Sequence, residues 1–109
     1  SDWVVTKAAA GAFTRTELDA KLRERGIRAL IVAGLMTHLA VDSTARDATL
    51  LGYAVIVASD ATATRDLPGM DGAPLVHHAD VQRVALASLA DRFADIASTR
   101  AITSFRVAP

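Results

Sequence analysis

The chain has 109 residues, of which 51% are hydrophobic, with 12 basic and 12 acidic residues and no cysteine. That length fits one small domain, and the apolar fraction excludes a disordered chain. The balanced charge provides no basic surface for nucleic acid, and no apolar run reaches the roughly 18 residues of a membrane span. Without cysteine, disulfides, thiolate metal sites and a thiol nucleophile are excluded. We therefore expect a cytoplasmic protein with no nucleic-acid or membrane partner and no metal or other cofactor.

Short apolar runs alternate with longer amphipathic segments along the chain. An unbroken apolar run such as Ala29–Ala33 is typical of a strand buried on both faces of a sheet. Thr16 before an acidic turn indicates a helix start, and Gly26 and Gly52 indicate helix ends. In chain order we expect strand Trp3–Lys7, helix Glu17–Arg25, strand Ala29–Ala33, helix Thr37–Leu51, strand Ala54–Ala58, helix Leu75–Phe93 and strand Ala101–Phe105. This alternation predicts right-handed βαβ units and an α/β fold with parallel strands.

Polar features stand at the ends of three predicted strands, where open parallel sheets bind their ligands. They are Lys7, the turn formed by residues 34–40, and Asp60. Taken singly, each has a structural explanation, because strand-end lysines are usually solvated, and Asp60 and Thr37 suit turn or capping positions. Their functional meaning depends on how they combine.

Three segments resemble the isochorismatase-like cysteine hydrolase family. Lys7 with the segment 11–18 is similar to the family's K-x(4)-A-F-x-x-T-x-L pattern. Residues 32–48 resemble its G-x-x-T-H-x-C-V-x-x-T-x-R-x-A signature, and residues 51–61 resemble its G-Y-x-V-x-V-x-x-D-A strand. The resemblance covers residues 4–100 and implies a three-layer α/β/α, Rossmann-like domain with a parallel sheet.

The resemblance implies an Asp, Lys and Cys site acting on a small-molecule substrate. Lys7 would position the other two groups and stabilise charge, and Ala40 occupies the position of the nucleophilic cysteine. The amides of Met36 and Ala40 would form the oxyanion hole at the positive end of a helix, and Leu35–Met36 would be the family's non-proline cis peptide. The expected substrate-pocket residues are Phe13, Thr37 and His38, with core packing as the alternative for Phe13.

Two departures from the family pattern bear on activity. Ala40 cannot form a thiolate, so acyl-enzyme formation by this route is excluded. The family's catalytic Asp lies on a first strand that this sequence lacks, so residues 1–109 are expected to be the C-terminal portion of a single isochorismatase-like domain. Strand Leu30–Ala33 would then have an unpaired apolar edge. We therefore expect a homo-oligomer or a companion N-terminal chain.

Three functions stay open from the sequence. The first is a hydrolase acting on a small amide-type C–N substrate, here without its cysteine. The second is a thiol-independent, isochorismatase-type hydrolase of a vinyl ether, for which a small residue at position 40 is sufficient. The third is a non-catalytic binding or assembly module.

Other polar residues are expected to have structural roles. His77 and His78 are expected to cap a helix or face solvent, because no third metal ligand is apparent. Arg46 with Asp47 suggests a structural ion pair.

Overall fold

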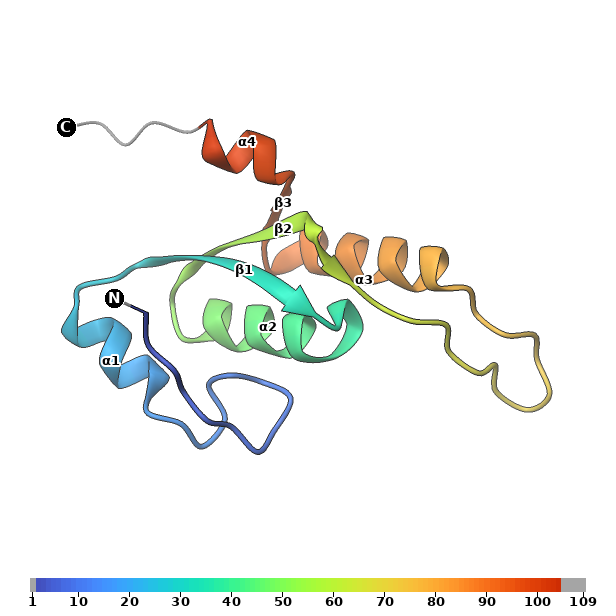
Figure 1. Cartoon of the computed structure of the whole chain (residues 1–109), viewed down its shortest axis with the longest axis horizontal. Helices are drawn as coiled ribbons and strands as arrows, with labels where there is room; N and C mark the ends of the chain where they lie inside the picture. Colours follow the sequence, from blue (N-terminus) through green and yellow to red (C-terminus); the bar gives the residue numbers. More distant parts are fainter. Residues whose placement is uncertain (1, 105–109) are drawn as a thin grey trace.

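The structure is a computed structural model that describes residues 2–104 (Figure 1). Within these residues the sheet has three parallel strands in the order β1-β2-β3. They are β1 (Ala29–Leu35), β2 (Ala54–Ala63) and β3 (Asp95–Ala97). The predicted α/β class with parallel strands is confirmed, and among residues 2–104 no strand pairs with the outer side of β1.

Two of the helices connect neighbouring strands and cover one face of the sheet. In chain order they are α1 (Leu18–Glu24), the π-helical turn η1 (Thr37–Val41), α2 (Asp42–Leu50), α3 (His78–Arg92) and α4 (Thr99–Thr103). In Figure 1, α2 and α3 lie on the same side of the strands, and the short α4 lies beyond the opposite side. No helix within residues 2–104 is long and apolar enough to cross a membrane.

The hydrophobic core lies between the sheet and the covering helices. Val32, Val55 and Val57 on the strands pack with residues of α2 and with Leu89 of α3. Ile31 points to the opposite face of the sheet and is 59% exposed. The expectation that the first apolar run is buried on both faces is therefore wrong for the described residues. Because successive residues of a strand point to opposite faces, a sheet covered by helices on one side leaves alternate residues in solvent.

β2 is longer than the sequence indicated. The apolar run ends at Ala58, but the strand continues to Ala63 after a register shift that places Gly34 opposite Thr62. Asp60 therefore lies within the strand rather than after it. The polar residues of this segment are accommodated because the shift lets β2 bulge away from β1 before pairing resumes.

The predicted strand Trp3–Lys7 is wrong, since this segment has no strand pairing. A short extended segment needs a partner strand to satisfy its backbone groups. Trp3 is instead 37% exposed and lies against α1, with its ring 5.0 Å from the guanidinium of Arg25 and 5.9 Å from Nζ of Lys21. Trp3 is thus not a core residue.

The C-terminal part also differs from the prediction. The strand expected over Ala101–Phe105 is wrong for the described positions, which form α4, and Phe105 lies outside the described residues. A hydrogen bond from the Ala101 amide to Ser98 Oγ (3.1 Å) caps this helix. In the part of the chain that the structure describes, β3 is the last strand, and it precedes this cap.

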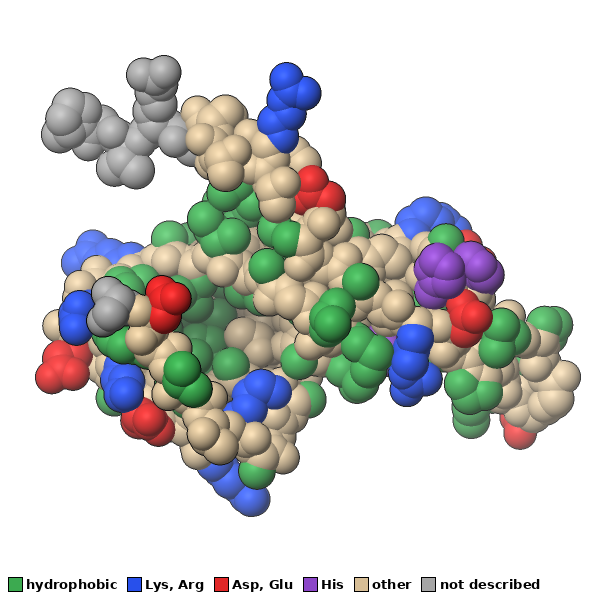
Figure 2. All heavy atoms as spheres, in the orientation of Figure 1, with side chains coloured by type: hydrophobic (Ala, Val, Ile, Leu, Met, Phe, Trp, Pro, Cys, Tyr) green, Lys and Arg blue, Asp and Glu red, His purple; other side chains and the backbone are tan. Residues whose placement is uncertain are grey.

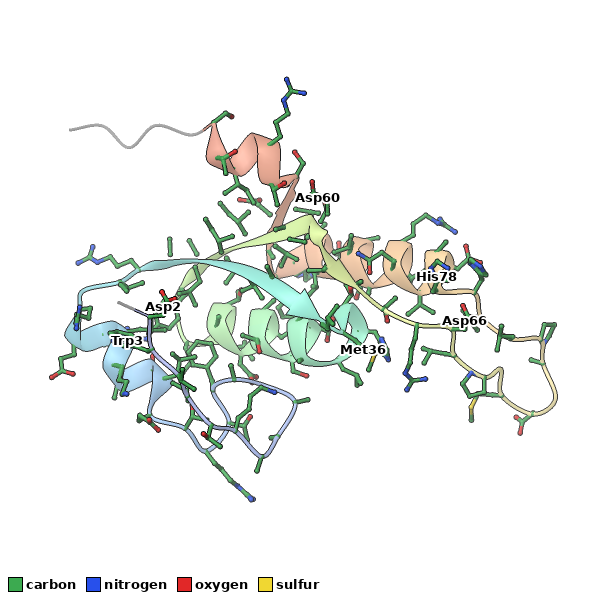
Figure 3. All side chains as sticks on the ribbon, viewed as in Figure 1. Asp2, Trp3, Met36, Asp60, Asp66 and His78 are labelled. Atoms are coloured by element: carbon green, nitrogen blue, oxygen red, sulfur yellow. The ribbon has the colours of Figure 1, made fainter. Side chains whose placement is uncertain are left out.

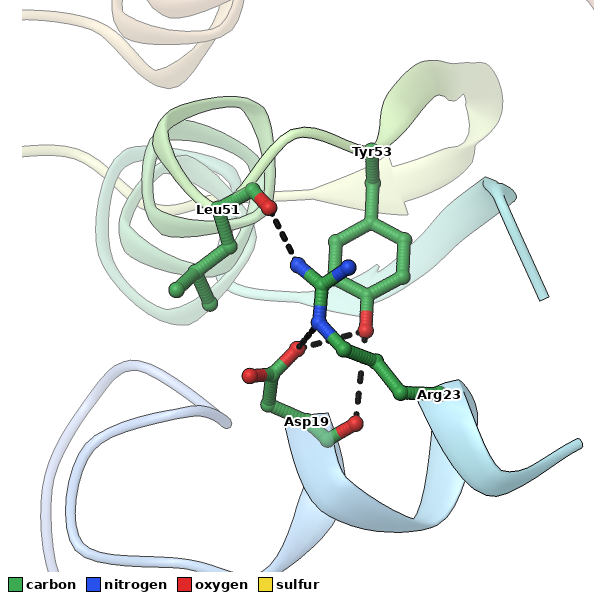
Figure 4. Close-up of polar contacts among 4 residues, drawn as sticks. All are labelled: Asp19, Arg23, Leu51 and Tyr53. Carbon is green, nitrogen blue, oxygen red and sulfur yellow. Dashed lines mark hydrogen bonds and ion pairs between the residues drawn. The ribbon is translucent and has the colours of Figure 1, made fainter. Parts of the chain in front are cut away.

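A polar cluster fastens α1 to the segment between α2 and β2 (Figure 4). The hydroxyl of Tyr53 donates a hydrogen bond to Asp19 Oδ1 at 2.6 Å. Arg23 contacts the same oxygen at 3.1 Å, donates to the carbonyl of Leu51 and lies 5.0 Å from the Tyr53 ring centre. Burial, followed by the hydrogen bond to Asp19, raises the pKa of the Tyr53 hydroxyl.

Candidate active site

The last residues of β1 and the turn that follows them join the edge strand to η1. Gly34 has φ of +125°, a conformation that side-chain-bearing residues rarely adopt, and the peptide bond between Leu35 and Met36 is cis. The carbonyl of Met36 then accepts hydrogen bonds from the amides of Leu39 (3.0 Å) and Val41 (3.2 Å). These bonds connect the turn directly to η1.

A cavity of about 220 Å³ opens beside this turn. Lys7 from the N-terminal segment and Ala40 from η1 both line it, although they are far apart in sequence. The other lining residues are Ala12, Val32, Ala33, Gly34, Leu35, Val41 and Thr44. The walls are mostly small or aliphatic, so Lys7 is the charged side chain of the cavity lining.

The loop that carries Lys7 is packed onto α2. The amide of Ala12 donates to Thr44 Oγ1 at 3.0 Å, and a Cβ added to Gly11 would lie 2.8 Å from Asp47 Oδ2, too close for a normal contact. Within this loop, Lys7 Nζ donates to the carbonyls of Ala9 and Ala10, both at 3.1 Å. An ammonium has three donors, so one remains for another group in the cavity.

The three expected pocket residues lie elsewhere. Phe13 stacks on Tyr53, with 5.8 Å between ring centres. Thr37 is fully buried, and its hydroxyl donates to Gln82 Oε1 at 2.5 Å. His38 Nδ1 lies 2.5 Å from Thr64 Oγ1 and lines a larger cavity of about 360 Å³ between α3 and the segment after β2. The structure therefore brings Lys7, Leu35 and Ala40 together but separates these three residues from them.

Gln82 was not predicted to have a role, yet its side chain connects α3 to the first residue of η1. Its Nε2 donates to Thr62 Oγ1 at 3.0 Å, while its Oε1 accepts from Thr37. Thr62 in turn donates to the carbonyl of Ser59 at 3.1 Å. This network connects α3, the resumed part of β2 and the first residue of η1. The only available signal was a polar residue beside the buried stripe of Val81, Ala85 and Leu89.

Other polar candidates have structural roles. Arg46 pairs with Asp42 at 2.8 Å, so the suggested pairing with Asp47 is wrong; an (i, i+4) spacing on α2 brings these two side chains onto one face. Asp60 accepts from the amide (2.7 Å) and hydroxyl (3.0 Å) of Thr99. The hydrogen bond from the Thr99 amide, followed by the one from its hydroxyl, lowers the pKa of the Asp60 carboxyl. The expected capping role of Asp60 is confirmed.

His77 also caps a helix, as expected, because its Nδ1 accepts from the Ala79 amide at 3.2 Å. The prediction that no third metal ligand lies near His77 and His78 is wrong. The carboxylate of Asp66, which precedes the loop 67–76, lies close to both rings. The sequence does not show that Asp66 is close to the histidines, because this proximity arises only when the loop 67–76 folds back on itself.

A parallel sheet with a small cavity at the carboxyl end of a strand places the chain among α/β proteins of the kind that bind small molecules at strand ends. The particular family follows from comparison with known proteins. The model of the Isochorismatase domain matches residues 1–101, so the chain belongs to the isochorismatase family.

Individual relatives agree with this assignment. The secreted isochorismatase effector Isc1 of Verticillium dahliae is 41% identical over 99 residues, covering 91% of this chain and 49% of the relative. The ureidoacrylate amidohydrolase RutB of Enterobacter sp. is 46% identical over 61 residues, covering 56% and 26%. The crystal structure of a cysteine hydrolase from Pseudomonas syringae pv. phaseolicola superposes with a TM-score of 0.88 at 37% identity, covering 93% and 47%. The chain thus spans no more than about half the length of these relatives.

Proposed function

We propose that this chain is the C-terminal part of an isochorismatase-family hydrolase whose Asp, Lys and Cys type of site is built for a small amide-type C–N substrate at the cavity beside Ala40. In residues 1–109 this site lacks both the cysteine and the Asp-bearing strand. The observation that carries the proposal is that Lys7 and Ala40 line one cavity. In an amide hydrolase of this kind, a cysteine thiolate at position 40 attacks the amide carbonyl, and nearby backbone amides stabilise the oxyanion.

The position of Ala40 suits a nucleophile. It lies in η1, directly before α2, where the positive end of a helix dipole favours a thiolate and an oxyanion. The amides of Met36 and Ala40 are the proposed oxyanion donors. With alanine at position 40, the cavity can hold a substrate but cannot form the acyl-enzyme. The printed activity of the relative RutB, an amidohydrolase, supports an amide as the substrate class.

Thiol chemistry at position 40 tests the site within this chain. Because the chain has no cysteine, Ala40→Cys introduces a single thiol, and Ala87→Cys on the exposed side of α3 is a matched control. The rate of alkylation by iodoacetamide is measured against pH for both variants. We expect the midpoint of the profile to lie about one pH unit lower or more for Ala40→Cys. Lys7→Met in the Ala40→Cys background should move the midpoint upward. Equal midpoints for the two thiols would contradict the proposed site.

Activity is tested in the complete reading frame that contains this chain, with Ala40 and with Ala40→Cys. A panel of small primary amides and ureido compounds is supplied, together with isochorismate. Amide turnover that depends on Ala40→Cys supports the proposal. Turnover of isochorismate with Ala40 in place would assign the thiol-independent vinyl ether hydrolase instead. No turnover by either form would favour a binding or assembly module.

A further inference from the structure

Asp66, His77 and His78 form a cluster away from the proposed active site; we refer to it as the Asp–His cluster. An isolated antiparallel bridge joins Leu67 and Val76, with hydrogen bonds of 2.9 and 2.8 Å between their backbones. This bridge closes the loop at its base, and Asp66 lies beside His78 at the entry to α3 (Figure 3). None of the three residues lines the cavity of Lys7 and Ala40.

The donor atoms of the Asp–His cluster converge. One nitrogen of each histidine and one carboxylate oxygen of Asp66 all lie within 4.8 Å of one another, and the ring centres of the histidines are 4.2 Å apart. A tetrahedral Zn²⁺ ion at about 2.0–2.2 Å from its ligands keeps them roughly 3.4 Å apart. All three side chains are exposed, which leaves room for the rotations that would close the remaining difference.

Backbone contacts already orient two of the three ligands. Asp66 Oδ1 accepts from the His78 amide at 2.7 Å, which directs the carboxylate toward the histidines and leaves Oδ2 for a cation. Carboxylate ligands of metals are commonly held by such hydrogen bonds. His77 Nδ1 accepts from the Ala79 amide, so a neutral His77 ring carries its proton on Nε2. A cation bound at Nδ1 replaces that hydrogen bond directly, and a cation bound at Nε2 requires the ring proton to move to Nδ1, which also ends the bond. In both cases the lost hydrogen bond moderates the affinity for the cation.

The charges around the cluster are mixed, because Arg65 donates to the carbonyl of Asp66 at 3.3 Å and adds positive charge beside it. The positive end of the α3 dipole opposes a metal ion, but Asp66 and Asp80, in the first turn of α3, contribute negative charge. Asp80 is paired loosely with Arg83 at 3.5 Å. Figure 2 shows the histidine side chains of this face next to both acidic and basic ones near the start of α3.

Two imidazoles and one carboxylate suit Zn²⁺ and the neighbouring late first-row divalent ions, and suit Mg²⁺ or Ca²⁺ poorly, since those ions prefer oxygen ligands. We propose that Asp66, His77 and His78 bind one such ion, which fastens the base of the loop 67–76 to the start of α3. Three protein ligands leave the remaining coordination positions to water.

Isothermal titration of Zn²⁺ into the chelator-treated chain tests the proposal. We expect one ion per chain with micromolar affinity and no comparable binding of Mg²⁺. His78→Gln and Asp66→Asn should each weaken binding by at least about tenfold. Asn at position 66 keeps an oxygen for the His78 amide, so the fold of the loop is retained. Asp71→Asn, in the same loop, is the matched control and should bind as the original chain does.

Titration with Co²⁺, followed by visible absorption, gives an independent readout of nitrogen and oxygen coordination. ¹H–¹⁵N spectra of the histidine rings report which rings are involved, and we expect the signals of His77 and His78 to shift while that of His38 stays in place. Failure to reach saturation with Zn²⁺ at millimolar concentration would overturn the proposal. Saturable binding that His78→Gln and Asp66→Asn leave unchanged would overturn it equally.

Discussion

The hydroxyl of buried Thr37 donates a hydrogen bond to Gln82, so the first residue of η1 is held by α3 rather than by its own helix. Gln82 also bonds Thr62 on β2, and each end of its amide therefore has a partner. Three elements that surround the proposed active-site turn are connected through this one side chain.

Replacing Gln82 by Leu should destabilise the fold. The substitution leaves the buried hydroxyls of Thr37 and Thr62 with one partner fewer, and unsatisfied buried groups cost about 1–3 kcal/mol in the free energy of unfolding. Urea unfolding followed by circular dichroism measures the change. Arg83→Gln, which removes only an exposed ion pair on α3, is the control and should change stability by less than about 1 kcal/mol. Equal effects of the two substitutions would show that the Gln82 network contributes nothing particular.

Replacing Tyr53 by Phe should make the protein less stable at neutral pH and less sensitive to alkali. The raised pKa of the Tyr53 hydroxyl means that the folded state retains this proton more tightly than the unfolded state does. Its stabilising contribution is complete below the unfolded pKa of about 10 and is lost as the pH rises through the higher folded value. Thermal unfolding between neutral pH and strong alkali should therefore show the Tm difference from Tyr53→Phe shrinking at the alkaline end. A constant difference would contradict this explanation.

Asp60 should show the opposite dependence on pH. Its pKa is lowered by the bonds from Thr99, so its contribution is present above the unfolded pKa of about 3.9 and is lost as the pH falls through the lower folded value. Asp60→Asn should lower the Tm at neutral pH and converge with the original chain in strong acid. Thr99→Ala keeps the amide donor and should reproduce only part of this effect. If the Tm difference were the same at acidic and neutral pH, the carboxylate charge would not be the cause.

The open edge of β1 should make the isolated chain associate with itself. Ile31 and Leu35 on this strand are 59% and 69% exposed, and an unpaired apolar edge is a template for another strand. Sedimentation velocity at increasing concentration should show growing oligomers, and Ile31→Lys should suppress them.

Leu50→Lys is the control for this prediction. Leu50 is 78% exposed but lies at the end of α2, away from the sheet edge. Its substitution should leave self-association nearly unchanged. If both lysine variants suppress association equally, then general charge and not the strand edge controls it.

The sequence was most informative where a segment's own pattern determines its structure. The apolar runs of β1 and β2, and the helical periods of α1, α2 and α3, were found because local periodicity controls them. Trp3–Lys7 has the composition of a strand, but a strand also requires a partner, which composition does not provide. Similarly, α4 depends on Asp60, a residue distant in sequence that bonds Thr99.

The proposed site shows the same division. Lys7 and Ala40 were identified from motifs, and the structure places both at one cavity. Thr37 and His38 belong to the same motif, yet their side chains turn toward Gln82 and Thr64 instead. A motif fixes the path of the backbone, but the direction of each side chain depends on partners that fold in from elsewhere, and these were not visible in the sequence.

The bridge between Leu67 and Val76 also determines where this chain can be lengthened. The two backbone hydrogen bonds hold the loop closed at its base. We therefore expect a change within residues 68–75 to leave the positions of β2 and α3 unaltered. Exposed loop tips of this kind tolerate insertions best. A peptide tag or fluorescent label placed between Met70 and Gly72 would therefore project from the molecule without shifting the start of α3, which makes this loop the natural attachment point for immobilising the protein.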